Sequence, residues 1–488
     1  MTPGGSTQPS DHGTHTAVVA KDFNDVTELS LTDITKQLWQ RFQGEMLERV
    51  AVLERAAMAA LEESLDQDGT VAITQKFYGG GRAYAVGIDL GFLLLRGYNN
   101  RAEEFARSYV NQFEPSLDVL LGLVKAIYQA GEPSAVTIGT VPFGKSLSVL
   151  LTHDIDYTKS MENAIAYAEY EKSQGIKGTY FIQTKYIRDY NDDVFFNQHG
   201  VNLLKQLAGL GMDLGSHTVA HSKELKNFPL GSGAEQYPSY SPFVKNRSTA
   251  LNGTVLGELR VSKFLIETFS GQPVVSFRPG ELSNPFALPQ ALAASGYLFS
   301  SSVTANSSLT HLPFQLNYGR GTDTELNVYE FPVTVEDEEF PQMEQQLPQA
   351  LELAQRIRRY GGCFVVLIHP NVLDHKLEFE NKFVSAVKDF GWFGSLTEFG
   401  HWWSARNTVT VDVYPQAPKH MMVVKVPQRM TGLTLHIPEG WRLQEVEPKG
   451  VNVEQAGHSV IVGEVVGEIK LFFENQTPTL ASLVRELN

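Results

Sequence analysis

The chain has 488 residues, of which 42% are hydrophobic, and this size and composition indicate a globular protein of two or three domains. The formal net charge is -15 and lysine and arginine form no cluster, so we expect no nucleic-acid partner, which would need a basic face. No run of about 18 apolar residues occurs, so we expect no integral membrane segment in this chain.

Residues 1–21 are rich in glycine, serine, threonine and proline and contain few large apolar side chains. This is the composition of a flexible linker, because such a segment cannot bury a core. It fits what remains after an export signal has been removed, although an ordinary cytoplasmic N-terminus has the same composition.

Residues 22–145 show a mainly helical pattern and are expected to form an N-terminal domain. Apolar residues between positions 38 and 61 recur every three to five residues, which predicts a long amphipathic helix. Gly79–Gly81 is the expected tip of a hairpin, and helices are expected at 102–113 and 116–130.

Residues 146–406 alternate strand and helix patterns, which predicts a barrel or a doubly wound sheet. The expected strands are 147–154, 178–184, 212–216, 274–278, 298–303, 328–334, 363–369 and 392–397. The expected helices are 158–174, 200–209, 255–268, 342–360 and 376–390. Polar residues follow the ends of several strands, which is where barrel enzymes place their active sites.

Residues 407–488 consist of short segments of β character with turn residues between them, which predicts a small β-sandwich. The domain is either a carbohydrate-binding accessory module or a structural clamp on the barrel. Trp441 is its only tryptophan, so a row of exposed aromatic rings is not indicated.

The stretch SLSVLLTHDIDY at residues 146–157 ends in two carboxylates. Side chains alternate along a strand, so Asp154 and Asp156 share one face. Two like charges so close together invite a metal ion or a catalytic base. The alternative is a pair of solvated turn aspartates.

His217 and His221 follow the predicted strand 212–216. An i, i+4 spacing on a helical turn would place both imidazoles on one face, where they could bind a divalent metal. Two histidines and one carboxylate suit zinc or a similar ion that keeps a water. The alternative is a pair of surface or helix-capping histidines.

Arg278 and His369 stand at the ends of two further strands. Arg278 either forms a structural salt bridge or fixes a catalytic carboxylate by a bidentate hydrogen bond. His369 lies on the inward face of its strand and is either a satisfied core histidine or a general acid.

Four motifs together carry a resemblance to a known family. They are THDID at 152–156, HTVAHS at 217–222, FRPG at 277–280 and LIH at 367–369. In order and spacing they resemble the polysaccharide deacetylase family, the NodB-homology domain of carbohydrate esterase family 4, over about 260 residues. The resemblance implies a distorted (β/α) barrel and metal-dependent removal of acetyl groups from an N-acetylated polysaccharide, with release of acetate.

The resemblance also implies roles for the matching residues. The implied catalytic residues are Asp154 as general base, Arg278, which fixes the position of Asp154, and His369 as general acid. The implied ligands of a divalent metal are Asp156, His217 and His221, and Zn²⁺ is the expected ion. The implied partner is an acetylated polysaccharide, and a periplasmic or extracellular location follows from that substrate.

The chain departs from the usual motifs at three places. Ile155 separates the two aspartates, which leaves the division of roles between Asp154 and Asp156 open. Gly280 stands where the family has an aromatic residue. The family's fourth motif has no clear match, so the sequence identifies no residue that would orient His369.

Two other functions remain open from the sequence. One is a metal-dependent amidase that acts on a small cyclic amide on the same barrel, because a fold does not define a substrate. The other is a catalytically silent carbohydrate-binding protein, which the presence of all six candidate residues disfavours. Nothing in the sequence indicates the glycan, the choice between N- and O-deacetylation, or the oligomeric state.

Overall fold

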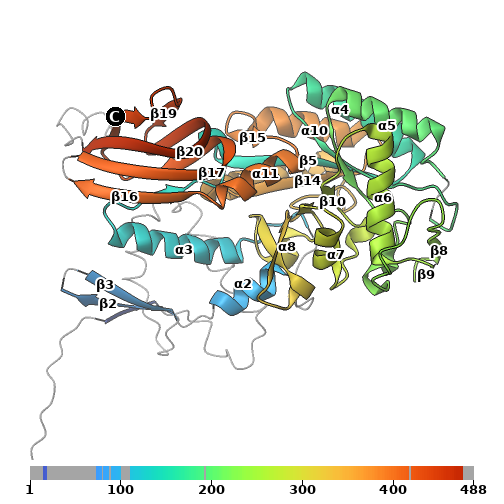
Figure 1. The fold of residues 1–488 in the computed structure, drawn as a ribbon, viewed down its shortest axis with the longest axis horizontal. Coiled ribbons are helices and arrows are strands. Elements are labelled where there is room, and N and C mark those ends of the chain that lie inside the picture. The colour runs from blue at the N-terminus through green and yellow to red at the C-terminus, as the bar shows by residue number, and fades with distance from the viewer. Residues whose placement is uncertain are drawn as a thin grey trace, which may run out of the picture. The chain divides into compact units, whose positions relative to one another are not determined.

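The structure is a computed structural model of the chain (Figure 1). It describes residues 15–18, 73–79, 81–86, 90–99, 110–191, 194–416 and 419–475. The amphipathic helix predicted between residues 38 and 61 lies outside these residues, as do most of the predicted linker and most of the predicted helix 102–113.

The chain divides into two compact units. The first comprises Met1–Leu93 and Leu120–Pro133, and the second comprises Leu94–Val119 and Ser134–Asn488. The second unit contains the barrel and the C-terminal sheet, and therefore all the candidate site residues.

The first unit contains a small antiparallel sheet in the order β1 (His15–Val18), β2 (Ile73–Tyr78) and β3 (Gly81–Val86). Tyr78 pairs with Gly81, so the predicted hairpin with its glycine tip is confirmed. The described helices before the barrel are α2 (Leu90–Tyr98) and α3 (Ser116–Gly131), and the second matches the predicted helix 116–130.

The barrel is built from parallel strands in the order β13, β11, β10, β7, β6, β5 and β14. Their bounds are β5 Leu147–Ile155, β6 Thr179–Ile182, β7 Asp213–Ser216, β10 Ser276–Phe277, β11 Phe299–Ser300, β13 Glu325–Glu330 and β14 Cys363–Ile368. β12 (Phe314–Asn317) adds to β13 in the antiparallel direction, and β15 (Gly391–Phe393) pairs with the start of β5.

The segment that follows β13 closes the sheet. Val335 forms a parallel bridge with Val366 of β14, and the Leu367 N–H donates to the Val335 carbonyl at 2.9 Å. The first and last strands of the row are thereby joined through a few irregular contacts, which confirms the distorted barrel that the resemblance implied.

Helices connect successive strands on the outside of this sheet, as the view in Figure 1 shows for α4, α5, α6 and α10. The helix bounds are α4 Thr158–Ser173, α5 Gln198–Leu210, α6 Val255–Ser270, α7 Leu288–Ala294, α8 Ala305–Ser308, α9 Leu347–Ile357, α10 Asp374–Val387 and α11 Leu396–Arg406. The short 3₁₀ helices are η3 Pro142–Gly144, η4 Lys223–Asn227, η5 Gly280–Leu282, η6 Tyr318–Arg320, η7 Met343–Gln346 and η8 Arg358–Tyr360. A hairpin of β8 (Phe243–Asn246) and β9 (Thr249–Leu251) stands between β7 and α6 in the chain.

β5 is buried along its whole length, because a central parallel strand is covered on both faces. Its side chains alternate as predicted. Asp154 contacts the residues at the ends of β7 and β10, whereas His153 contacts α4 and α10. Adjacent residues of β5 therefore point to opposite sides of the sheet, Asp154 into the barrel and His153 toward the helix layer.

The C-terminal region forms one antiparallel sheet in the order β16, β17, β20 and β18, with β19 and β4 (Thr137–Ile138) at its margins. The strand bounds are β16 Thr410–Gln416, β17 Lys419–His436, β18 Trp441–Glu447, β19 Val453–Ala456 and β20 Ser459–Asn475. The predicted β character of this region is confirmed. The described strands form one continuous sheet and not two separate ones, because β17 and β20 pair with each other from end to end across a bulge between Val426 and Met430.

A single hydrophobic core joins the C-terminal sheet to the barrel. Its members include Phe299 and Phe331 of the barrel, Phe399 and Trp402 of α11, and Met422 of β17. Trp441 belongs to the same core and stacks on His420 with ring centroids 4.2 Å apart. This packing favours the structural clamp over a module that presents aromatic rings to a glycan.

Within the described ranges, no helix combines the length and the apolar character that a membrane crossing would need.

Candidate active site

The structure brings all the sequence-predicted site residues together at the carboxyl ends of the barrel strands. These residues are Asp154, Asp156, His217, His221, Arg278 and His369. β7, β10 and β14 end directly before His217, Arg278 and His369. Residues that lie far apart in the sequence thus meet because parallel strands end at the same edge of the sheet.

Asp156, His217 and His221 form a cluster with the donor types of a metal site. Asp156 Oδ1 lies 3.2 Å from His217 Nε2 and 3.4 Å from His221 Nε2. Among the described residues this oxygen has no hydrogen-bond donor of good geometry. His217 Nδ1 donates to the Arg278 carbonyl at 2.9 Å, which leaves the Nε2 lone pair for a metal. One carboxylate and two imidazoles at this spacing fit a divalent cation.

The segment that carries both histidines is a loop. The predicted helical turn at residues 217–221 is wrong, because Thr218 and His221 adopt positive φ angles of 70° and 53°. The loop nevertheless brings the two rings to 5.0 Å between centroids. Gly280 allows this path, since a Cβ at that position would lie 2.6 Å from Cδ2 of His221. The missing aromatic residue of the third motif therefore makes room for a metal-type ligand.

Polar side chains hold this loop from outside. Glu258 on α6 accepts hydrogen bonds from the N–H groups of Val219 at 2.7 Å and Ala220 at 2.9 Å. Its other carboxylate oxygen accepts a hydrogen bond from the Tyr240 hydroxyl at 2.8 Å. Asn191 donates to the His221 carbonyl at 2.7 Å. Sequence reasoning identified none of these residues, since helical glutamates and loop asparagines carry no local signal for such a role.

Asp154 is paired with Arg278. Arg278 donates through Nη1 to Asp154 Oδ1 at 2.8 Å, and its other nitrogens bind the carbonyl and hydroxyl of Ser301 at 3.2 and 2.8 Å. The predicted ion pair is present, but the predicted bidentate geometry is wrong because the guanidinium divides its donors between two residues. Arg278 is fully buried and lies over the Phe181 ring at 4.4 Å, so it has little freedom to leave Asp154.

His369 has a carboxylate partner that the sequence did not reveal. Its Nδ1 donates to Asp337 Oδ1 at 2.7 Å, and its backbone N–H donates to Asp337 Oδ2 at 2.7 Å. Lys376 Nζ lies 2.6 Å from the same Oδ2. His369 Nε2 points the other way, to 3.4 Å from Asp156 Oδ2. Burial by itself would lower the pKa of His369, but the charge and hydrogen bond of Asp337, aided by Asp156, raise it to about 10.

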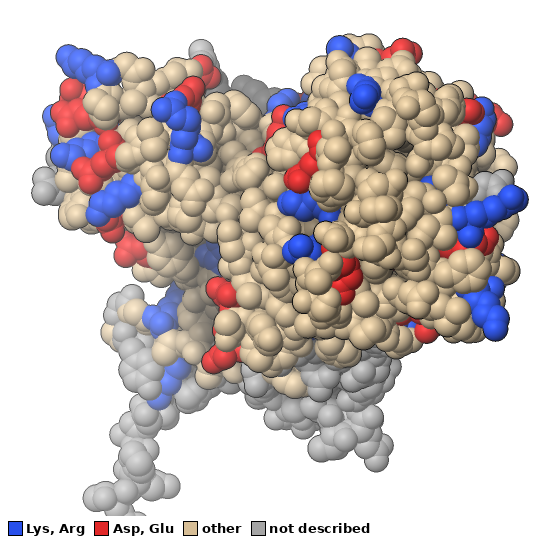
Figure 2. Space-filling model, turned by 45° about the vertical axis from the view of Figure 1, so that its right-hand side comes forward, with Lys and Arg blue, Asp and Glu red and all other residues tan. Residues whose placement is uncertain are grey.

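The molecular surface carries charges of both signs. Figure 2 shows lysines and arginines interspersed with aspartates and glutamates over the face in view. The described residues on this face form no extended basic area.

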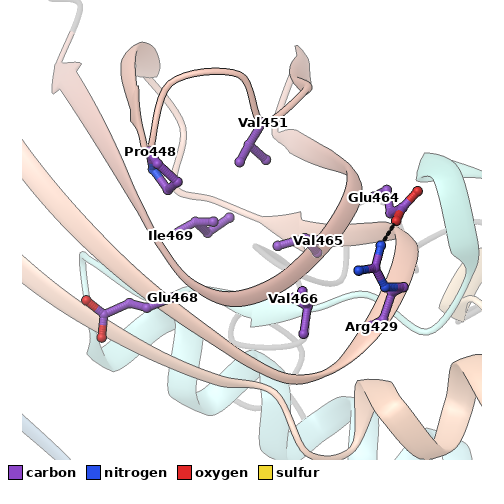
Figure 3. Close-up of a pocket in the computed structure, with 8 residues that line it drawn as sticks. All are labelled: Arg429, Pro448, Val451, Glu464, Val465, Val466, Glu468 and Ile469. Carbon is purple, nitrogen blue, oxygen red and sulfur yellow. Dashed lines mark hydrogen bonds and ion pairs between the residues drawn. The ribbon is translucent and has the colours of Figure 1, made fainter.

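A shallow hollow occurs in the C-terminal sheet, away from the residues described above. It is lined by Arg429, Pro448, Val451, Glu464, Val465, Val466, Glu468 and Ile469. Figure 3 shows the ion pair of Arg429 and Glu464 on one side of Val465 and Val466. No lining residue is aromatic, so the hollow offers no ring on which a sugar could stack.

Residues 144–299 match the polysaccharide deacetylase family model. Over these residues the chain is similar to the polysaccharide deacetylases. The matched segment includes the first three motifs, so the family resemblance seen in the sequence is confirmed, and it ends before Asp337 and His369.

Solved structures similar to this chain have low sequence identity to it. A protein from Mycobacterium smegmatis assigned to the polysaccharide deacetylases is 15% identical over 56% of this chain and 96% of its own, with a TM-score of 0.41. The peptidoglycan deacetylase PdaC from Bacillus subtilis is 13% identical over 54% of this chain and 93% of its own, with a TM-score of 0.32. A pseudoenzyme of carbohydrate esterase family 4 from Bacillus anthracis is 15% identical over 53% and 66%, with a TM-score of 0.31. No curated protein sequence matches the chain.

Charges and burial at the site act differently on the three candidate ligands, and the charges of Asp154 and Asp156 raise the pKa of His217. Burial by itself would raise the pKa of Asp156, but His221, His217 and His369 lower it well below its ordinary range. Burial lowers the pKa of His221, and this effect outweighs the attraction of Asp156. Asp156 is therefore ionised and His221 neutral near pH 7, as metal ligands must be.

Proposed function

We propose that this protein is a metal-dependent hydrolase that removes acetyl groups from an N-acetylated polysaccharide and releases acetate. One observation carries the proposal. The metal-type cluster of Asp156, His217 and His221 lies between two groups that can move protons, Asp154 held by Arg278 and His369 held by Asp337. A hydrolase of amides needs both a base for water and an acid for the leaving amine.

Asp156, His217 and His221 would hold the divalent cation, with Zn²⁺ expected for two imidazoles and one carboxylate. When bound, the cation supplies Lewis-acid chemistry, which polarises an acetyl carbonyl and lowers the pKa of water. Among the described residues the cluster offers three protein ligands, the number typical of catalytic zinc sites.

Asp154 would act as the general base. It is the carboxylate whose Oδ1 binds Arg278, whereas Asp156 Oδ1 lies between the two histidine nitrogens. Arg278 keeps Asp154 in one orientation, in which its carboxylate can accept a proton from the attacking water. This arrangement supports Asp154 as base and Asp156 as ligand.

His369 would act as the general acid. Asp337 accepts its Nδ1–H, so Nε2 is the nitrogen that faces the cluster and can donate a proton to the departing amine. The backbone N–H groups at Tyr157 and Thr158, where α4 begins, would donate to the oxygen that becomes negative during attack. The products would be acetate and a free amino sugar.

We further propose that the protein acts in the periplasm or outside the cell, because its proposed substrate is a polysaccharide and residues 1–21 have linker composition. Fractionation of cells that make the full-length gene product tests this. Recovery from the cytosol alone would contradict the location and leave the chemistry untouched.

The direct test is acetate release by the purified chain from oligomers of N-acetylglucosamine. We expect release in the presence of zinc, loss of activity after treatment with a chelator, and recovery when zinc is returned. Ring opening of a small cyclic amide without acetate release would instead favour an amidase. Binding of the oligomers without hydrolysis in any metal would mean that the site is silent.

A further inference from the structure

A second cluster of metal-type residues lies on the other side of β5 from Asp154. His153 of β5, Glu171 of α4 and Glu380 of α10 meet between the sheet and the helices. His153 Nε2 lies 2.9 Å from Glu171 Oε1 and 3.6 Å from Glu380 Oε2, and all three side chains have 0% exposure. The proposed deacetylase chemistry makes no use of these groups.

The cluster lacks the donors that two buried carboxylates require. Neither carboxylate oxygen of Glu380 has a hydrogen-bond partner among the described residues, and His153 Nδ1 has none either. Glu171 Oε2 accepts one hydrogen bond, from the Tyr180 hydroxyl at 2.7 Å. One Nε2–H cannot serve both glutamates at full strength, and a buried carboxylate without compensation is strongly unfavourable.

The residues around the cluster restrict its three side chains to positions in which they face one another. The rings of Tyr180 and Tyr167 flank His153 at centroid distances of 4.5 and 5.1 Å. The Tyr167 hydroxyl donates to the Val372 carbonyl, so it does not supply a donor to the glutamates. Gly178 leaves the space that Glu171 occupies, since a Cβ there would lie 2.3 Å from Glu171 Oε1.

We propose that His153, Glu171 and Glu380 bind a second divalent cation, a structural one, of the first transition row. Nitrogen to oxygen distances of 2.9 and 3.6 Å bracket the roughly 3.3 Å that separates ligands on a tetrahedral ion with bonds of about 2.0 Å. A dication with two carboxylates and a neutral imidazole makes a group of zero net charge, which suits a closed interior. Imidazole with carboxylates is a donor set that zinc, manganese and iron(II) accept.

A shared proton is the competing explanation. Burial and the charge of Glu171 raise the pKa of Glu380 well above its ordinary value, so without a cation Glu380 would hold a proton. The proton and the cation neutralise the cluster equally well. The two explanations predict different numbers of metal ions per chain, and this number can be measured.

The experiment is metal analysis of the full chain after gel filtration, for the parent, the His217→Ala/His221→Ala double variant and Glu380→Gln. We expect two equivalents in the parent and one in each variant. Glu378→Gln is the matched control, because this exposed residue lies on the same helix and should leave two equivalents.

The outcomes separate this inference from the proposed function. One equivalent that disappears in the histidine variant but persists in Glu380→Gln overturns the second site and favours the shared proton. One equivalent that persists in the histidine variant but disappears in Glu380→Gln supports the second site and contradicts the catalytic metal. Should Glu380→Gln fail to fold, anomalous diffraction from parent crystals at the metal edge gives the answer, since a peak must appear between His153 and Glu380.

Discussion

Two clusters of similar donors lie on opposite faces of one strand, and they differ chiefly in access. Asp156, His217 and His221 stand where β5 and β7 end, and the His221 side chain is 14% exposed. His153 with its two glutamates lies one layer outward, beneath α4 and α10, with no exposure. The nitrogen to oxygen distances overlap, at 3.2 and 3.4 Å against 2.9 and 3.6 Å.

The difference shows that position within a barrel, more than donor type, determines what such a cluster can do. Strand ends run into loops, so a cluster there can keep room for a substrate. The middle of a strand is covered by helices, and a cluster there can only support the fold. Closed metal sites are structural and open ones catalytic for this reason. His153 and Asp154 are neighbours in sequence, yet the alternation of the strand assigns them to different clusters.

The largest effect should come from removing the proposed base on the open side. Asp154→Asn keeps the size of the side chain and cannot accept the proton from water, so we expect turnover to fall by about 10²–10⁴ with the bound metal unchanged. Acetate release and metal content, measured on the same sample, check this. Glu378→Gln serves as the control. Full activity in Asp154→Asn would mean that Asp154 is structural.

A smaller effect is expected from Asp337, the residue that orients the proposed acid His369. Asp337→Asn removes the carboxylate that raises the pKa of His369, so the pKa of His369 falls. The protonated form is then lost at lower pH, and the alkaline limb of the kcat profile should move to lower pH. We expect turnover near neutral pH to fall by about a hundredfold, within the range of general acid catalysis.

A pH profile of constant shape would argue against this role for Asp337. His369→Ala should lose activity, and its kcat profile should also lose the alkaline limb. The two variants together therefore distinguish a general acid oriented by Asp337 from a histidine with only a structural role.

Much of this site could be predicted from sequence because its signals are local. The alternating pattern of residues 146–157 placed both aspartates on one face, and the motifs placed Arg278 and His369 at strand ends. Asp337 was missed because it lies in the acidic run 336–339, where nothing distinguishes it from its neighbours before the barrel closes beside His369. The spacing of His217 and His221 was informative although its helical explanation was wrong, since a loop with positive φ angles achieves the same convergence.

The remaining parts depend on contacts between distant segments. The pairing of His153 with Glu380 requires β5 and α10 to be adjacent, and single helical glutamates do not reveal this. The continuous C-terminal sheet follows from the full-length pairing of β17 with β20, whereas the sequence showed a series of separate short strands. Turn residues inside β17, such as Pro427 and Gly432, divided one bulged strand into two apparent ones.

The smallest of the expected effects concerns the support of the open cluster. Glu258 binds the loop between the two histidines through Val219 and Ala220, and it touches no group that would react. Glu258→Ala leaves two N–H groups without an acceptor, so the loop loses its conformation and metal affinity should fall by about tenfold or somewhat more. Glu258→Gln should recover most of the affinity, because an amide oxygen can accept the same two hydrogen bonds. Titration of the metal-free protein with zinc measures this, and the affinity of the second cluster for its metal should be the same in all three proteins. Equal affinity in the alanine variant would show that the loop holds its shape without Glu258, and equal loss in both variants would show that the charge matters more than the hydrogen bonds.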